Sequence, residues 1–595
     1  MTDLSLQLSQ LEFAQLVRHL AEEEPAYIFK HVLTQDAAYQ SLLQKQRREI
    51  HRDVARAYEA IYEDSCLDDY AAILAQHYAA AGDEAKTRDY AIRAAELALR
   101  TNANAEAAMY FGRAIEIVKR GRVETFAKRA TSLLSLYLKR GRALELCGQY
   151  FDALSNYTEM YSVARESKDR VFELAAMMAR ATLHATPTRL QNLELGRTLL
   201  DGALALAREV KDRAAESKAL WNLMIIEYFS GHPAQSVEYG EQALGIAREL
   251  NLPEQIAYIL NDISRNYAAL GRVEDALGAL SQARELWKSL GNLPMLVDNL
   301  GTSADNAVSF GNYAQALLWA EESHRLSIQI GNLWNQAYSQ WVLGSIYYEQ
   351  GRFKQAVETL TATMQMGDES GFVVATWAAR VILAWLYGSV GLATRGITLL
   401  APFVDQVRPV DVPFKAWGLG VLALLYLQTG NLAQAETLVA EASRDPKRED
   451  LANMVAIIVT LCEGSVAMAH RQYEQVEPSA RALLQQYEST KIHIYKADLM
   501  LLTARALHAL GKIDAARAML AQAKTEAETV GTRRVLWEIL AEWSNLETES
   551  GNAVVAQTLR TQAREIVDFI LEHAPDDLRE PFLNLPRVRQ IMEQS

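Results

Sequence analysis

The chain has 595 residues, of which 50% are apolar and 23% are charged, and its formal net charge at pH 7 is −14. These proportions exclude a disordered chain, and the acidic balance disfavours binding of nucleic acid over the whole surface. Three widely separated cysteines without a paired framework indicate a reducing, cytoplasmic compartment: Cys66, Cys147 and Cys462. The first ten residues lack the basic and apolar segments of a secretory signal.

The N-terminal segment is predicted to contain a helix over Leu4–Leu16 and a second helix over Gln44–Ala57. Four basic residues of the second helix recur at spacings of three and four and make one basic face: Lys45, Arg48, Arg52 and Arg56. We interpret this face as a solvated helix surface. The alternative is an electrostatic dock for a nucleotide-binding partner or for nucleic acid.

Regularly spaced glycines characterise most of the chain. They stand 40 residues apart at Gly231, Gly271, Gly311, Gly351 and Gly391, and the same position returns at Gly430, Gly511 and Gly551. Self-similarity at a period of 20–50 residues is typical of stacked repeats, in which each unit buries its apolar face against its neighbours. A second series of turns between these glycines leaves room for two helices in each repeat. The spacing therefore predicts an all-α solenoid.

One repeat shows the unit most clearly. Leu343 and Tyr347 are four residues apart and share one face of a first helix, and the small Gly344 permits a close neighbour. Gly351 ends this helix, and Ala356 begins the contact face of the second helix. The unit is thus a helix–turn–helix pair.

No signature of an enzyme, a metal site or a cofactor site is found along these helices. Gly418–Ala423 matches the spacing of a dinucleotide-binding loop, but no strand is expected before it, so helix packing explains its glycines better. The apolar stretch Phe372–Ala393 contains Arg380 and coincides with a repeat helix, which favours a buried helix over a membrane span. We therefore expect a protein that is not an enzyme and carries no cofactor or metal.

The small-residue, Tyr, Gly and Ala positions of the repeat resemble those of the tetratricopeptide repeat (TPR), in the longer form of the MalT-like TPR region. The N-terminal segment is similar to a stretch that joins a bacterial AAA/STAND ATPase module, often with an adenylate cyclase domain, to such an array. The residues that carry this second resemblance are Tyr27–Tyr39, Leu42, Leu43, Arg47, Arg48 and His51. No phosphate-binding loop G-x-x-x-x-G-K-[ST] occurs in the chain, so the resemblance concerns the sensor arm without the ATPase module.

Together these observations predict a right-handed superhelical solenoid of about twelve TPR-like antiparallel helix pairs with a period of about 40 residues. The expected segments are a remnant of a winged helix and linker at 1–65, N-terminal TPR-like pairs at 66–125, the main solenoid at 126–567 and a C-terminal cap at 568–595.

Candidate partner-binding residues follow from the resemblance, because the first helices of TPR pairs line the concave surface. Counting back from the turn glycines gives Trp221, Tyr228, Tyr258, Asn261, Arg265, Asp298, Asp305, Tyr338, Trp341, Tyr348, Trp385 and Trp417. Aromatic anchors among Asn, Arg and Asp are typical of a peptide or protein interface. The alternative for each aromatic residue is packing between repeats.

We hypothesise a protein-interaction or ligand-sensing arm of a STAND-type ATPase or adenylate cyclase signalling system, with that module in cis or in trans. One alternative is a freestanding scaffold or adaptor. The other is a sensor of a small inducer, which would use an apolar pocket; the very apolar helices Val373–Tyr387 and Gly418–Leu427 favour such a pocket there. Membrane binding is not expected, and nucleic acid is disfavoured as a partner.

Overall fold

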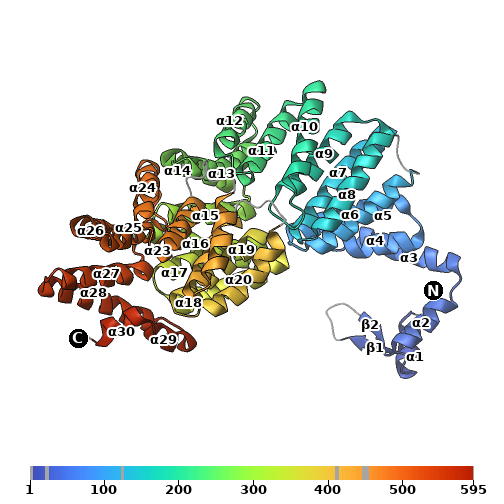
Figure 1. The fold of residues 1–595 in the computed structure, drawn as a ribbon. Coiled ribbons are helices and arrows are strands. Elements are labelled where there is room, and N and C mark those ends of the chain that lie inside the picture. The colour runs from blue at the N-terminus through green and yellow to red at the C-terminus, as the bar shows by residue number, and fades with distance from the viewer. Residues whose placement is uncertain (1–3, 21–25, 122–125, 409–414, 445–453, 594–595) are drawn as a thin grey trace. The chain divides into compact units, whose positions relative to one another are not determined.

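The computed structural model describes residues 4–20, 26–121, 126–408, 415–444 and 454–593. The chain forms two compact units, Met1–Met160 and Tyr161–Ser595. Both units are built almost wholly from helices, which Figure 1 shows in chain order. The expected segment boundary at residue 125 lies outside the described residues.

The first unit begins with a helix and a hairpin. Strands β1 (Val17–Leu20) and β2 (Ala26–Phe29) pair antiparallel, with Val17 opposite Phe29. The predicted helix over Leu4–Leu16 is therefore shorter and ends at Phe13. The helices of this unit are α1 (Leu4–Phe13), α2 (Val32–Ser41), α3 (Gln44–Ile61), α4 (Ala71–Ala81), α5 (Glu84–Arg100), α6 (Asn104–Lys119) and α7 (Phe126–Leu146), and α8 (Tyr150–Ser167) crosses the boundary between the units.

The second unit contains ten consecutive helix pairs and two short terminal helices. The pairs are α9 (Arg170–Ala185) with α10 (Leu193–Glu209), α11 (Arg213–Phe229) with α12 (Pro233–Glu249), α13 (Pro253–Ala269) with α14 (Val273–Ser289), α15 (Leu293–Ser309) with α16 (Tyr313–Gln329), α17 (Leu333–Glu349) with α18 (Phe353–Ser370), α19 (Val373–Ser389) with α20 (Ala393–Val407), α21 (Lys415–Gln428) with α22 (Leu432–Ser443), α23 (Met454–Ala469) with α24 (Val476–Thr490), α25 (Lys496–Ala509) with α26 (Ile513–Val530), and α27 (Arg533–Glu549) with α28 (Ala553–Glu572). The terminal helices are α29 (Asp576–Leu583) and α30 (Pro586–Glu593).

Local sequence sets the ends of these helices. Gly351 has φ of +74° between α17 and α18, a left-handed conformation that glycine adopts without steric cost. Asparagine side chains cap several helix starts: Asn292 accepts a hydrogen bond from the backbone N–H of Met295, and Asn332 accepts one from that of Asn335. Stop and start signals of this kind recur with the repeat, and the prediction of an all-α solenoid of helix pairs is confirmed.

The first helices of successive pairs form one layer of the second unit. Each of α9, α11, α13, α15, α17, α19, α21, α23 and α25 contacts the first helix of the next pair as well as its own partner. Residues that point into this layer, such as Leu343 and Ala356, are buried between neighbouring pairs. Because every pair covers the apolar face of the next, the core grows lengthwise along the array.

The last four pairs and terminal helices, α23–α30, fold back against the middle of the array, and we call them the C-terminal arm. Figure 1 shows the orange and red helices of the arm beside the green and yellow helices α15–α20. The backbone N–H of His493 donates to the carbonyl of Ser309 at 3.0 Å, and that of Lys354 donates to the carbonyl of His573 at 2.7 Å. The arm therefore makes backbone contacts with two successive turns of the array.

The turn glycines of the array lie against this arm. A Cβ atom on Gly271 would lie 2.5 Å from Cβ of Thr490, and one on Gly351 would lie 2.9 Å from Cγ1 of Ile570. Gly311 and Gly391 are approached in the same way by His493 and Leu585, respectively. These glycines thus combine a left-handed turn with a close approach of distant chain.

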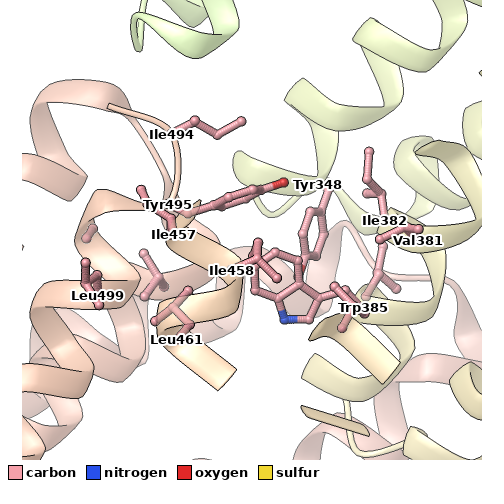
Figure 2. Close-up of a cluster of buried hydrophobic side chains, with 14 of the residues drawn as sticks. Tyr348, Val381, Ile382, Trp385, Ile457, Ile458, Leu461, Ile494, Tyr495 and Leu499 are labelled. Carbon is pink, nitrogen blue, oxygen red and sulfur yellow. The ribbon is translucent and has the colours of Figure 1, made fainter. Parts of the chain in front are cut away.

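An apolar interface joins the arm to the first helices α17 and α19 (Figure 2). The ring of Tyr495 lies 4.9 Å from that of Trp385, which lies 6.2 Å from the ring of Tyr348. Ile457 and Ile458 of α23 are fully buried in the same cluster. The arm therefore covers the first-helix layer at α17 and α19.

Candidate ligand-binding face

The first helices α11, α13, α15 and α17 carry a stripe of polar and aromatic side chains, which we call the inner polar face. On α13 the stripe includes Tyr258, Asp262 and Arg265, and on α15 it includes Asp298 and Asp305. Spacings of four and three place these residues on one side of each helix, and the repeat of 40 residues brings the two stripes next to one another. The side chains of these charged residues are half-buried.

Arg265 occupies the centre of the inner polar face. Its Nη1 donates to Oδ1 of Asp262 at 3.3 Å, and its Nη2 donates to Oγ1 of Thr302 at 2.7 Å and to the hydroxyl of Tyr338 at 3.2 Å. The indole Nε1 of Trp221 donates to the other oxygen of Asp262 at 2.9 Å. One guanidinium thus connects three helices and fixes the position of the aromatic groups.

Buried amides hold the neighbouring part of the face. The Nδ2 of Asn261 donates to Oδ2 of Asp298 at 2.9 Å. The Nδ2 of Asn299 donates to Oδ1 of Asn261 at 3.0 Å and to the carbonyl of Leu280 at 3.1 Å. Because Asn261 and Asn299 are fully buried, they hold Asp298 in one position at the surface of the face.

Burial changes the protonation of the carboxyl groups on this face. It raises the pKa of Asp262 and that of Asp305 to about 6, and it also raises the pKa of Asp298, although Arg265 acts against all three shifts. Burial likewise raises the pKa of Tyr228 to about 12. The positive charge of Arg265 therefore does not fully compensate the three carboxylates that surround it.

Aromatic rings flank the charged cluster on both sides. The ring of Trp221 lies 5.4 Å from that of Tyr258, and the ring of Tyr338 lies 5.6 Å from that of Trp341 in a stacked geometry. Trp221, Tyr258 and Trp341 are half-buried, whereas Tyr338 is buried. The face thus combines ring surfaces with charged groups that keep partial access to solvent.

The sequence prediction missed Asp262 and Thr302, which bind Arg265 directly. Asp262 follows Tyr258 by four residues, and Thr302 lies one repeat of 40 residues after Asp262. Extending the same stripe by one helical turn in each repeat would have identified both residues.

Three of the predicted residues lie in the core instead of on an accessible face. Tyr348 and Trp417 are 1% exposed and Trp385 is 8% exposed. Tyr348 and Trp385 pack against the C-terminal arm, as Figure 2 shows, and Trp417 is enclosed by the helices around α21. Their prediction as exposed partner contacts is corrected, because the arm and the following pairs cover the first-helix layer there.

A second charged cluster lies where the arm meets α17. Arg534 of α27 donates hydrogen bonds to both carboxylate oxygens of Glu349 and of Asp498, and the hydroxyl of Thr532 donates to Glu349 at 2.5 Å. Arg534 and Glu349 are almost fully buried. Sequence reasoning missed this cluster, because its members are up to 185 residues apart and share no repeat position.

The predicted basic face lies on α3 in the first unit. Its members are Lys45, Arg48, Arg52 and Arg56. Lys45, Arg48 and Arg56 are exposed, and Lys45 faces Glu49 at 3.9 Å. Arg52 is half-buried, and its Nη2 donates to the carbonyl of Ala81 at the end of α4. Three members of the face are thus accessible, and one also holds α3 to α4.

Among the helices of the described ranges, none combines the length and the apolar character that crossing a lipid bilayer requires. Within those same ranges, no group of three or more His, Cys, Asp or Glu side chains is arranged to hold a metal ion.

Comparison with known proteins relates this geometry to a family. The chain is similar in structure to a Rap protein complexed with competence and sporulation factor, with 16% identity and a TM-score of 0.47 over 61% of this chain and 99% of that one. It is also similar to aspartyl phosphate phosphatase F from Bacillus subtilis, with 13% identity and a TM-score of 0.38 over 60% of this chain and 92% of that one. A STAND protein with a tetratricopeptide repeat sensor from Pyrococcus horikoshii has 12% identity and a TM-score of 0.32, over 74% of this chain and 57% of that one.

No curated protein matches the chain in sequence. The family model of the MalT-like TPR region matches residues 215–531, from α11 to the end of α26. This range includes the whole inner polar face and the first half of the arm. Since the match covers more than half of its residues, the chain belongs to the family of the MalT-like TPR region.

Proposed function

We propose that this TPR solenoid binds a peptide or an extended protein segment on the inner polar face of α11–α17, and that it acts by binding instead of by catalysis. One observation carries the proposal: Arg265 and Asp262 are held by hydrogen bonds from four successive first helices and still keep side-chain exposures of 25% and 20%. A TPR-type helical repeat is suited to protein interaction, and preorganised aromatic and arginine side chains are the usual anchors of such interfaces.

A peptide fits this face better than a small apolar inducer does. The two apolar helices that favoured an inducer pocket, α19 and α21, bury their side chains against neighbouring pairs and against the arm. Their composition is thus explained by packing. The inner polar face, in contrast, offers donors, acceptors and rings along several helices, which suits an extended ligand.

Panning of a phage-displayed heptapeptide library against the whole chain tests this function. We expect enriched peptides that bind the protein and lose binding to the variants Tyr258→Ala and Arg265→Ala. Asp201→Asn on α10 is the matched control, because Asp201 is exposed on a second helix. Absence of enrichment, or enriched peptides that bind Tyr258→Ala and Arg265→Ala unchanged, would refute the function.

The role that we infer for this binding is sensing, within a signalling system that contains a STAND-type ATPase or an adenylate cyclase, in cis or in trans. The family match and the resemblance of the N-terminal segment support this role. That segment also exposes the apolar side chains of Phe13, Val32 and Leu33, as expected of a segment that contacts another domain.

An immunoblot of the native protein with an antibody to the repeats tests the arrangement. A band well above the 66.4 kDa of this chain would place the module in cis. A band at that mass, together with failure to capture an ATPase or a cyclase, would favour the alternative of a freestanding scaffold.

A further inference from the structure

The charge of the inner polar face is unbalanced at its centre. Asp262, Asp298 and Asp305 lie on α13 and α15 around a single guanidinium, that of Arg265. Lys218 occupies the equivalent position to Tyr258 one repeat earlier, on α11, and is exposed. The centre of the face at α13 and α15 therefore carries more negative than positive charge.

The three carboxylates differ in how far their oxygens are used. Both oxygens of Asp262 accept hydrogen bonds, from Trp221 and from Arg265. Asp298 accepts one hydrogen bond, through Oδ2. Asp305 accepts no hydrogen bond from any of the residues that the structure describes. Acceptor capacity thus remains at Asp298 and Asp305, which are seven residues apart on the same side of α15.

A buried donor without a partner lies beside these acceptors. The Nδ2 of Asn306 is buried and has no hydrogen-bond partner in the described part of the chain, and the residue is 4% exposed. Asn306 follows Thr302 by one helical turn, and Thr302 binds Arg265 at the centre of the face. An unpaired buried amide costs free energy, so a ligand that supplies a carbonyl there would remove this cost.

Aromatic rings complete the surroundings of Asp305. The negative charge of Asp305 acts on the hydroxyls of both Tyr228 and Tyr338, which places this carboxylate between the two tyrosines. A carboxylate flanked by aromatic rings suits a cation, because the rings and the carboxylate both attract positive charge.

We propose that the inner polar face selects peptides with a lysine or arginine side chain, whose cationic group lies against Asp298 and Asp305 while a backbone carbonyl accepts from Asn306. This inference rests on the proposed function and names the ligand class of the same face. The carboxylates supply the selectivity, and Trp221, Tyr258 and Trp341 supply contact area that does not depend on charge.

The test uses four fluorescein-labelled heptapeptide mixtures that are identical except for the central residue, which is Lys, Arg, Leu or Glu. Their binding to the whole chain is measured by fluorescence anisotropy at pH 7.5. We expect the Lys and Arg mixtures to bind about tenfold more tightly than the Leu and Glu mixtures, and Asp305→Asn to abolish most of this preference.

Two further variants make the outcome decisive. Asp305→Lys should reverse the preference towards the Glu mixture, which a merely structural role of Asp305 would not produce. Asp201→Asn on α10 removes the same charge from an exposed second helix and should leave the preference unchanged. Thermal unfolding of each variant verifies that it is folded.

The result also separates this inference from the proposed function. If all four mixtures bind equally and Tyr258→Ala abolishes their binding, the face binds peptides but the selection for basic side chains is refuted. If none of the mixtures binds, both the selectivity and the proposed function are refuted.

Discussion

Arg534 and Glu349 form a buried ion pair across 185 residues of chain. The Nε of Arg534 donates to Oε1 of Glu349 at 3.0 Å, and its Nη2 donates to Oε2 at 3.1 Å. The other side of the guanidinium donates to both oxygens of Asp498, at 2.6 and 2.8 Å. This pair ties α17 in the array to α25 and α27 in the arm, so the fold-back is fixed by a directed interaction as well as by apolar burial.

Replacement of Arg534 by methionine is expected to lower the free energy of unfolding by about 3–5 kcal/mol, because it leaves two buried carboxylates without a cation. Equilibrium unfolding in urea measures the loss. Arg408→Met is the control, because Arg408 pairs with Asp405 and Glu441 at the surface and should cost less than about 1 kcal/mol. Equal losses in the two variants would show that the buried pair has no special role.

The loss in Arg534→Met should also depend on pH. Burial raises the pKa of Glu349, and Arg534 opposes this shift, so removal of Arg534 raises that pKa further. A carboxyl group with a raised pKa in the folded state stabilises the fold as the pH falls. The difference between the variant and the parent should therefore be smaller at pH 5 than at pH 8 in the same urea experiment.

Gly271→Ala is expected to destabilise the protein more than Gly551→Ala does. Both glycines have positive φ, so both substitutions incur the strain of a left-handed alanine, about 1 kcal/mol. At Gly271 the new Cβ would also lie 2.5 Å from Cβ and 2.6 Å from Cα of Thr490, whereas at Gly551 it meets no atom of the described residues within 4 Å. Comparison of urea midpoints measures the additional cost of separating the arm from the turn; identical midpoints would contradict the docking.

Asp305→Asn is expected to stabilise the free protein at pH 7 by about 1 kcal/mol and to have little effect at pH 4. Burial raises the pKa of Asp305 to about 6, whereas the unfolded chain keeps an ordinary value near 4. The folded protein therefore gains stability as the pH falls from about 6 to 4, and asparagine removes this dependence. Chemical unfolding at both pH values measures it. A variant that is less stable at pH 7 would show that the carboxylate is fully compensated by Arg265.

Trp385→Ala and Tyr258→Ala should have opposite profiles. Trp385 is enclosed between α19 and the arm, so its truncation should cost about 3–5 kcal/mol of stability and leave peptide binding by the folded protein unchanged. Tyr258 is half-buried on the inner polar face, so its truncation should abolish peptide binding at a smaller cost in stability. Urea unfolding and anisotropy on the same two variants give both quantities.

Periodic features of the structure could be predicted from the sequence, and contacts without a period could not. The spacing of Gly231, Gly271 and the later turn glycines indicated the helix pairs, since each turn repeats the same local requirement. Placing Arg265 and Asp305 on one face likewise needed only the helical period and the repeat. The hairpin before residue 30 was missed, because its strands are only four residues long.

Burial of Tyr348, Trp385 and Trp417 could not be predicted for a different reason. Each residue has the position of a concave-face side chain within its own repeat. What covers Tyr348 and Trp385 is the arm, more than 100 residues later in the chain, through residues such as Tyr495. A contact between two repeats that are not neighbours leaves no trace in a pattern that describes one repeat at a time.

The docking of turns against turns limits how this protein can change length. Residues of the arm that meet the turn glycines are themselves 40 residues apart: Thr490, Val530 and Ile570 form one series, and His493 and Arg533 begin another. Array and arm therefore match like two scales of equal pitch. Duplication or loss of a repeat, the ordinary way in which solenoids grow or shrink, would shift one scale against the other between α13 and α20. Repeats before α11 stand outside this constraint, so natural variation in repeat number should be confined to them.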